Sequence, residues 1–282
     1  MGIQDTSNIR RGTAGARAAG RGFVNSRAFE LLSRAGFVAR GLIYAIIGVL
    51  ALKLVVGHGG KLTNQQGALH TVAHQPFGKL LLLLVAIGLA GYSLWRLVRA
   101  VIGHGPEGSD SGLDRLAAAA SALAYGAICV IAVEILAGSA GSGGASTPKK
   151  AAAGVVGWPA GTWIVGIAGV VAIGVALYQV YRGLSRDFLS DSKVEQMGTK
   201  MRTFVRWAGT IGYVARGVVF GLVGIFLVKA AIDYNPNAAV GLDGALAKLV
   251  HHSYGPVILA AVAAGLVAFA AYSLSDARYR RI

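Results

Sequence analysis

The sequence has little charge: Asp, Glu, Lys and Arg make up only 14% of its residues, against about 25% in a typical soluble domain. A single cysteine, Cys129, excludes an intrachain disulfide and a cysteine-based metal site. The sequence also lacks a phosphate-binding Gly-rich motif, a dinucleotide fingerprint, a Ser-His-Asp constellation and paired catalytic carboxylates. We therefore expect no enzymatic activity, no catalytic residue and no cofactor.

Apolar residues take the place of the missing charge. Hydrophobic residues make up 55% of the 282 positions, and the mean hydropathy is +0.59, a value typical of membrane proteins. The 41 glycines suit closely packed membrane helices. A net charge of +15 would indicate nucleic-acid binding in a soluble chain, but here the basic residues flank apolar segments. We expect the lipid bilayer as partner, and no nucleic acid.

Six windows are apolar enough to cross a bilayer, which takes about 20 residues each. They lie near residues 36–56, 78–102, 113–136, 161–184, 207–232 and 255–274. Pro76, Pro159 and Pro256 stand at the entrances of the second, fourth and sixth windows, where the first-turn amides need no helical partner. The sequence therefore predicts an all-α membrane protein with six transmembrane helices.

The distribution of Lys and Arg predicts the orientation of these spans. Both tails and the loops after the second and fourth spans carry 20 of these residues, whereas the alternate loops carry five. Because basic residues concentrate on the cytoplasmic side, we expect a protein of the cell (plasma) membrane with both termini in the cytoplasm. Residues 1–34 form a basic tail, expected to be disordered up to about Ser26 and without the features of a signal peptide. Mitochondrial targeting is the alternative for this arginine-rich tail.

The six spans form three copies of a two-helix unit, over residues 35–105, 106–190 and 191–282. The motif Gly36-Phe37-Val38-Ala39-Arg40-Gly41 returns as Gly212-Tyr213-Val214-Ala215-Arg216-Gly217. In the second helix of each unit, Tyr92-Ser93-Leu94 corresponds to Tyr178-Gln179-Val180 and to Tyr272-Ser273-Leu274. All copies enter the membrane in the same direction, so we expect a pseudo-threefold bundle of three parallel two-helix repeats.

These motifs resemble those of the bacterial membrane proteins of domain of unknown function 1206. That family has a two-helix repeat, usually present three times, which opens with Gly-Phe/Tyr-x-Ala-Arg-Gly. The resemblance covers residues 35 to about 281, although Ser121-Ala122 replaces the Arg-Gly pair in the middle copy. It implies the fold and a bacterial membrane location, and it implies no activity.

Three charged residues in the spans occupy equivalent repeat positions: Lys53, Glu134 and Lys229. Intramembrane charges are candidates for function, and a threefold bundle would bring these three to one level as an ion or proton relay or an anion site. All three lie within a turn or two of the outer helix ends, so snorkelling to the interface is the favoured interpretation.

The repeated Arg-Gly pairs, Arg40-Gly41 and Arg216-Gly217, are placed about one turn into their helices at the cytoplasmic end. Each arginine can contact a lipid phosphate, pair with a loop acid such as Asp187, or snorkel. The glycine after it predicts a closely approached helix. Aromatic residues near the predicted helix ends indicate interfacial belts; they are Tyr92, Trp95, Trp158, Trp163, Tyr178, Tyr181, Trp207 and Tyr272.

Histidines gather on the outer side. His70 and His74 are spaced i,i+4 in a segment, 65–75, that we expect to be a short interfacial helix, and His251 and His252 lie in the equivalent loop. Two imidazoles at this spacing can face one metal ion. A metal or haem site is therefore one hypothesis, although the spacing alone is a weak motif.

Three functions remain open. The favoured one is an accessory or scaffold subunit that interacts with other membrane proteins or lipids, for which the mixed-charge segment 187–206 is the expected docking surface. The second is a transporter or channel for a small solute or ion that uses Lys53, Glu134 and Lys229. The third is a redox subunit that binds metal or haem through the outer histidines.

Overall fold

The computed structural model describes residues 26–58, 60–102, 112–138, 161–235, 239–250 and 254–281, and every regular element in these ranges is a helix. The six long helices are α2 (Arg27–Val55), α4 (Gly78–Ile102), α5 (Gly112–Leu136), α7 (Gly161–Ser185), α8 (Thr199–Ile232) and α10 (Gly255–Tyr279). Each is long and apolar enough to cross a membrane, which confirms six membrane-capable helices. The chain is a multi-pass membrane protein. The first 25 residues of the tail lie outside the described residues.

Two helices begin earlier than hydropathy predicts. The helix α2 starts at Arg27, where the Ser26 hydroxyl accepts a hydrogen bond from the Phe29 amide, so residues 27–34 belong to the helix and not to the tail. Arg34 holds this first part against the end of α10 by donating to the carbonyls of Ala277 and Arg278. The helix α8 starts at Thr199, eight residues before the expected span. Hydropathy locates the apolar stretch, whereas these polar turns are stabilised by capping and tertiary contacts.

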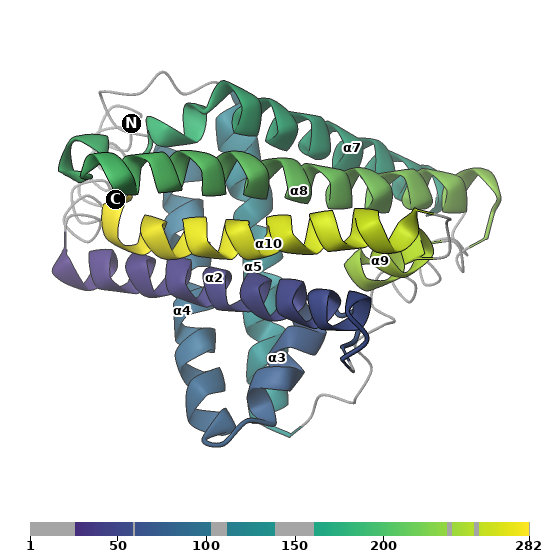
Figure 1. Ribbon diagram of the computed structural model, residues 1–282, viewed down its shortest axis with the longest axis horizontal. Helices are drawn as coiled ribbons and strands as arrows, with labels where there is room; N and C mark the ends of the chain where they lie inside the picture. Colours follow the sequence, from purple (N-terminus) through teal and green to yellow (C-terminus); the bar gives the residue numbers. More distant parts are fainter. Residues whose placement is uncertain are drawn as a thin grey trace, which may run out of the picture.

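The packing order follows the repeats. The first helix of each unit packs along the second helix of another: α5 on α4, α8 on α7, and α2 on α10. In the first and third repeats the two helices of the unit also pack together, α2 with α4 and α8 with α10. In the described part of the chain, α5 and α7 of the middle repeat are not packed along one another, so these contacts do not close a pseudo-threefold ring. In Figure 1, α7, α8, α10 and α2 lie side by side as one layer, and α4 and α5 run across it.

Glycines of the repeat motif allow these close contacts. A Cβ on Gly36 would lie 2.6 Å from the Cβ of Tyr92 in α4, and a Cβ on Gly212 would lie 2.6 Å from the Cα of Phe269 in α10. A Cβ on Gly217 would lie 2.6 Å from Val180 in α7. The close approach expected of the Arg-Gly pairs is therefore confirmed, with Gly41 facing Ala270 of α10 in the equivalent manner.

Two short helices lie between the long helices of the first and third repeats and pack against them. The helix α3 (Gln65–Ala73) confirms that a short helix forms in the segment 65–75, and it packs against α2, α4 and α5. Its repeat equivalent, α9 (Leu242–Val250), packs against α8 and α10. Both bury an Ala-Leu pair completely, Ala68-Leu69 and Ala245-Leu246. The repeats thus share loop structure as well as span structure.

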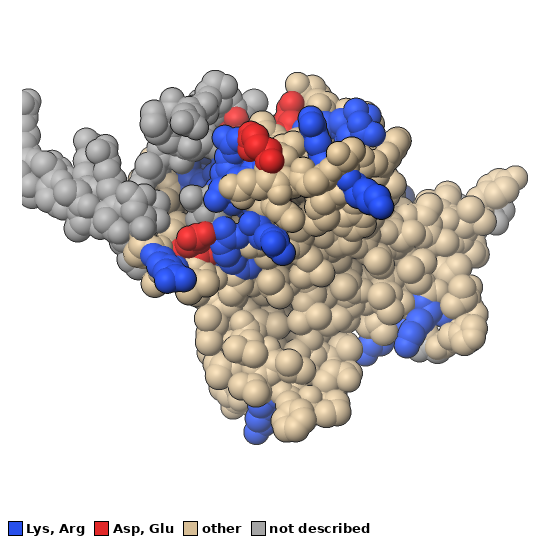
Figure 2. Space-filling model, turned by 60° about the vertical axis from the view of Figure 1, so that its left-hand side comes forward, with Lys and Arg blue, Asp and Glu red and all other residues tan. Residues whose placement is uncertain are grey.

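Charge is concentrated at one end of the molecule. Figure 2 shows Lys, Arg, Asp and Glu side chains gathered on the upper part of one face, with an uncharged band between them and a few basic residues farther away. The charged end holds the starts of α2 and α8 and the ends of α7 and α10, which lie together at the left of Figure 1. We call it the basic end.

Candidate functional site

The side chain of Arg40 is buried among three helices near the basic end, with 2% of its surface exposed. Its Nε donates to the hydroxyl of Ser273 over 2.9 Å, its Nη1 to the hydroxyl of Tyr92 over 2.7 Å, and its Nη2 to the carboxylate of Asp276 over 2.9 Å. A buried guanidinium is costly unless it is paired and hydrogen-bonded. Every nitrogen of Arg40 has such a partner, so this site is built around the cation.

Aromatic rings complete the surroundings of Arg40. The guanidinium carbon lies 5.0 Å from the ring centres of Phe37 and Tyr92, and 5.1 Å from that of Phe269. Ring faces are negative and attract cations, most strongly where water is excluded. The hydroxyl of Tyr92 also accepts a hydrogen bond from Arg96 over 3.0 Å, so one phenol serves two arginines.

A second cluster lies beside the first and is centred on Asp191. Its carboxylate forms ion pairs with Arg280 at 2.5 Å, Arg182 at 2.8 Å and Arg99 at 3.4 Å. Arg280 also lies 3.5 Å from Asp276 and therefore joins the two clusters. One carboxylate thus connects the ends of α4, α7 and α10; we call this group the Asp191 latch.

The electrostatics of the latch favour the ionised carboxylate. Burial opposes the charge on Asp191, but Arg280, Arg99 and Arg182 outweigh burial and hold the pKa of this carboxyl well below its ordinary value. Burial likewise opposes the charge on Arg280, and Asp191 with Asp276 raises the pKa of this guanidinium well above its ordinary value. The latch is therefore charged throughout the physiological pH range.

The latch fixes the segment 187–197 across the basic end. Phe188 is completely buried there; its ring stacks on Tyr213 at 5.3 Å and meets Tyr272 edge-on at 5.2 Å. The amide of Lys193 donates to the carbonyl of Tyr279, and Ser192 forms an isolated bridge with Arg280. The first part of the expected docking surface, 187–206, is thus folded onto the bundle, and its second part is the start of α8.

The equivalent site of the third repeat differs in charge. Arg216 lies 4.3 Å from the ring centre of Phe269 and 5.1 Å from that of Tyr44, in an aromatic setting like that of Arg40. The repeat alignment puts Arg182 where Arg40 has Asp276. Among the described residues, the buried Nε of Arg216 has no acceptor. Within the described part of the chain, Arg40 is thus the only one of the two motif arginines with an ion pair to a buried carboxylate.

The clusters together carry a surplus of positive charge. Arg40, Arg96, Arg99, Arg182, Arg216 and Arg280 stand against two carboxylates, Asp191 and Asp276. Ring faces and phenol hydroxyls offset part of this surplus. Such an arrangement fixes helices relative to one another and attracts anions to the basic end.

Several sequence-based placements of these residues were wrong. Arg40 lies about 20 Å along α2 rather than one turn into it, and its partner is Asp276 rather than Asp187, a lipid phosphate or water. Tyr92, Trp95 and Tyr272 do not form an interfacial belt, because each is at most 2% exposed and packs in the core. Trp163, Tyr181 and Trp207 are exposed, as a belt requires. Trp158 lies outside the described residues.

The structure does not bring Lys53, Glu134 and Lys229 together. All three side chains are exposed, and no ion pair joins them within the described ranges.

The predicted metal-binding histidines lie on and after α3. The imidazole Nδ1 of His74 lies 2.7 Å from the backbone oxygen of His70. The described residues contain no group of three or more metal-ligating side chains. His251 and His252 lie outside the described residues.

Comparison with known proteins gives a family and a relative. The family model described as Domain of Unknown Function (DUF1206) matches residues 35–103, 116–186 and 211–280. The chain is also 33% identical over 253 residues to the uncharacterized protein YxxB of Bacillus subtilis (strain 168). The matched region covers 88% of this chain and 90% of the relative. No solved structure matches this chain.

Proposed function

Because the chain belongs to the DUF1206 family of three-repeat membrane proteins, we propose that it is an accessory or scaffold subunit of the bacterial cell membrane. Both termini and the basic end face the cytoplasm in this proposal, since basic residues concentrate on that side. The proposal assigns the chain no catalytic activity. Its partners are other membrane proteins or lipids.

The Asp191 latch is the observation that carries this proposal. One carboxylate connects the ends of three helices and holds the segment 187–197 in place. A short segment with its backbone paired and its aromatic residue buried is a fixed surface. Fixed, charged surfaces suit specific docking, because little ordering entropy is lost on binding.

The test is a purification of the tagged protein from its native membranes in mild detergent. We expect a second membrane protein at near-stoichiometric level. Reversing two exposed charges where the fixed segment begins, Arg186→Glu with Asp187→Lys, should remove that protein. The matched control, Lys248→Glu, changes a charge at the opposite end and should retain it. A solitary wild-type protein, or a partner insensitive to the segment variant, would refute the scaffold proposal.

A transporter is the second candidate, favoured by the ion pair Arg40–Asp276 inside the membrane-spanning helices. Charges buried in spans commonly mark ion or proton pathways. The discriminating measurement is solute or proton flux into vesicles that contain the purified protein. Flux that is lost in Glu134→Gln, or in Asp276→Asn under conditions where that variant is shown to be folded, would support transport. The absence of flux in the wild-type protein would exclude it for the solutes assayed.

A further inference from the structure

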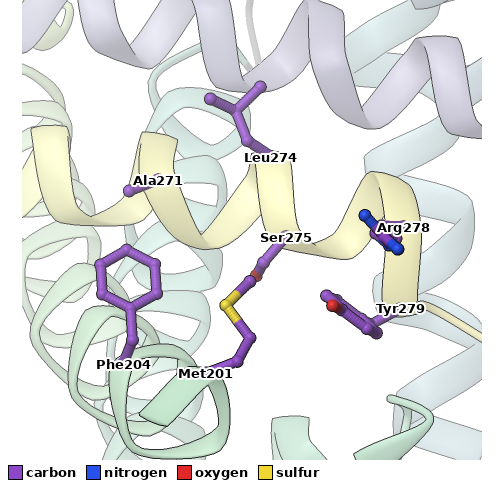
Figure 3. Close-up of a pocket in the computed structure, with 7 residues that line it drawn as sticks. All are labelled: Met201, Phe204, Ala271, Leu274, Ser275, Arg278 and Tyr279. Carbon is purple, nitrogen blue, oxygen red and sulfur yellow. The ribbon is translucent and has the colours of Figure 1, made fainter. Parts of the chain in front are cut away.

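An open groove lies between the start of α8 and the end of α10. Its volume is about 370 Å³, within the range of about 300–1,000 Å³ found for small-ligand sites. Figure 3 shows Met201 and Phe204 reaching from α8 towards α10, which contributes Ala271 and Leu274, with Arg278 and Tyr279 at one end. The walls are therefore apolar, and a cation stands at one end.

The groove runs across the expected membrane boundary. The apolar window of α10 ends at residue 274, so Ala271 and Leu274 lie at acyl-chain depth and Arg278 lies beyond it, at headgroup depth. On α8 the apolar window begins at residue 207, after both groove residues of that helix. Trp207, three residues after Phe204 on α8 and hence on the same side of that helix, is 52% exposed, as expected of a residue at the interface.

Arg278 lines the charged end of the groove, and Lys200 is a second cation one helical turn before Phe204. Arg278 is exposed, and Lys200 is exposed on α8 four residues before Phe204, hence on the same face of that helix. Neither forms an ion pair with another described residue. The nearest acidic side chains along the chain are engaged elsewhere, Asp276 with Arg40 and Arg280, and Glu195 with Arg281.

We propose that this groove binds an anionic glycerophospholipid of the cytoplasmic leaflet. One acyl chain lies against Met201, Phe204 and Leu274, and the phosphate group lies between Arg278 and Lys200. The upper part of an acyl chain matches walls that stay apolar from headgroup depth, at Met201 and Phe204, to acyl-chain depth, at Leu274. Two cations at headgroup depth that pair with none of the described acids match an anionic headgroup better than a zwitterionic one. The proposal rests on the cytoplasmic placement of the basic end, but not on a protein partner.

The test uses Trp207 as a reporter in the purified full-length protein. Phosphatidylglycerol or phosphatidylcholine with brominated acyl chains is titrated into detergent micelles, and the quenching of tryptophan fluorescence is measured. Subtracting the signal of a Trp207→Phe variant isolates the reporter. We expect phosphatidylglycerol to quench Trp207 at roughly tenfold lower concentration than phosphatidylcholine, and this preference to weaken in high salt.

Variants separate the two halves of the site. Arg278→Gln with Lys200→Gln should abolish the preference for phosphatidylglycerol, whereas Arg186→Gln, which removes a basic-end charge outside the groove, should retain it. Ala271→Phe should fill the groove and reduce quenching by both lipids. Thermal unfolding of each variant checks that it is folded.

Equal quenching by both lipids in the wild-type protein, or an unchanged preference in the double variant, would overturn the proposal. A groove closed by a second copy of the chain, seen as a dimer mass with Trp207 shielded from both lipids, would also overturn it. Loss of the protein partner with an intact phosphatidylglycerol preference would refute the scaffold role alone.

Discussion

Arg40 in the first repeat and Asp276 in the third form an ion pair of 2.9 Å, with only 2% and 1% of their side chains exposed. The pair joins the two ends of the chain, α2 and α10, inside the bundle. Ser273 and Tyr92 accept hydrogen bonds from the other two nitrogens of the guanidinium. This pair ties the repeat motif to the stability of the whole bundle.

Removing one partner of this pair should be strongly destabilising. Asp276→Asn leaves the cation of Arg40 buried without a counter-charge, which costs about 3–5 kcal/mol and should lower the Tm in detergent by roughly 10 °C. The double variant Arg40→Met with Asp276→Leu removes both charges and should recover much of the loss. A double variant as unstable as the sum of the single variants would show that the two residues act independently.

Loss of the Asp191 latch should release the segment 187–197. In Asp191→Asn three arginines lose their shared carboxylate, so we expect trypsin to cleave after Lys193 at least about tenfold faster, because local opening becomes easier. Mass spectrometry of the fragments measures this rate. Asp187→Asn is the matched control, since Asp187 is exposed in the same segment. Equal cleavage of both variants would contradict the latch.

The latch should resist acid. The pKa of Asp191 is lowered in the folded protein, so its stabilisation is fully present above the ordinary aspartate pKa of about 3.9 and is lost only as the pH falls towards the lower folded-state pKa. The Tm difference between wild type and Asp191→Asn should be constant from about pH 8 to pH 5 and shrink below about pH 4. A difference that vanishes near pH 6 would exclude this mechanism.

Glycine positions of the repeat should differ sharply in how well they tolerate substitution by alanine. A Cβ at Gly36 would lie 2.6 Å from Tyr92, whereas none of the described atoms outside its own helix lies within 4 Å of a Cβ at Gly174. Gly36→Ala should therefore lower the Tm by separating α2 from α4. Gly174→Ala should leave the Tm unchanged or raise it, since alanine favours a helix by about 0.5–1 kcal/mol over glycine. Similar Tm values for both variants would contradict the close packing.

Labelling with a membrane-impermeant maleimide tests the proposed orientation. In a Cys129→Ala background, Gln75→Cys after α3 should react in intact cells, because it is exposed at the outer end. Ser190→Cys, exposed at the basic end, should react only after the membrane is permeabilised. The reverse pattern would place the basic end outside.

Local sequence patterns predicted the helices well. The windows at 78–102 and 161–184 agree with α4 and α7 within a residue, because span length and hydropathy are set by the bilayer. The early starts of α2 and α8 were missed, since polar helical turns depend on caps and on contacts such as Arg34 with the end of α10.

The partners of the candidate site could not be read from local patterns. Arg40 and Asp276 are 236 residues apart in the chain, and hydropathy treats Asp276 as the end of a span. One signal was present: Asp276 follows the repeated Tyr-Ser-Leu motif at the position that holds Arg96 and Arg182 in the other units. A single acid at a position otherwise occupied by arginine indicates a possible counter-charge.

The sequence by itself determined six membrane-capable helices, three repeats and the clustering of basic residues, because these follow from local composition and spacing. Only the tertiary structure decided which charges are buried together. It paired Arg40 with Asp276, gathered three arginines around Asp191, and left Lys53, Glu134 and Lys229 exposed and apart. The reason is physical: a buried charge persists only where packing brings its counter-charge within hydrogen-bonding distance, and that distance depends on how the helices pack.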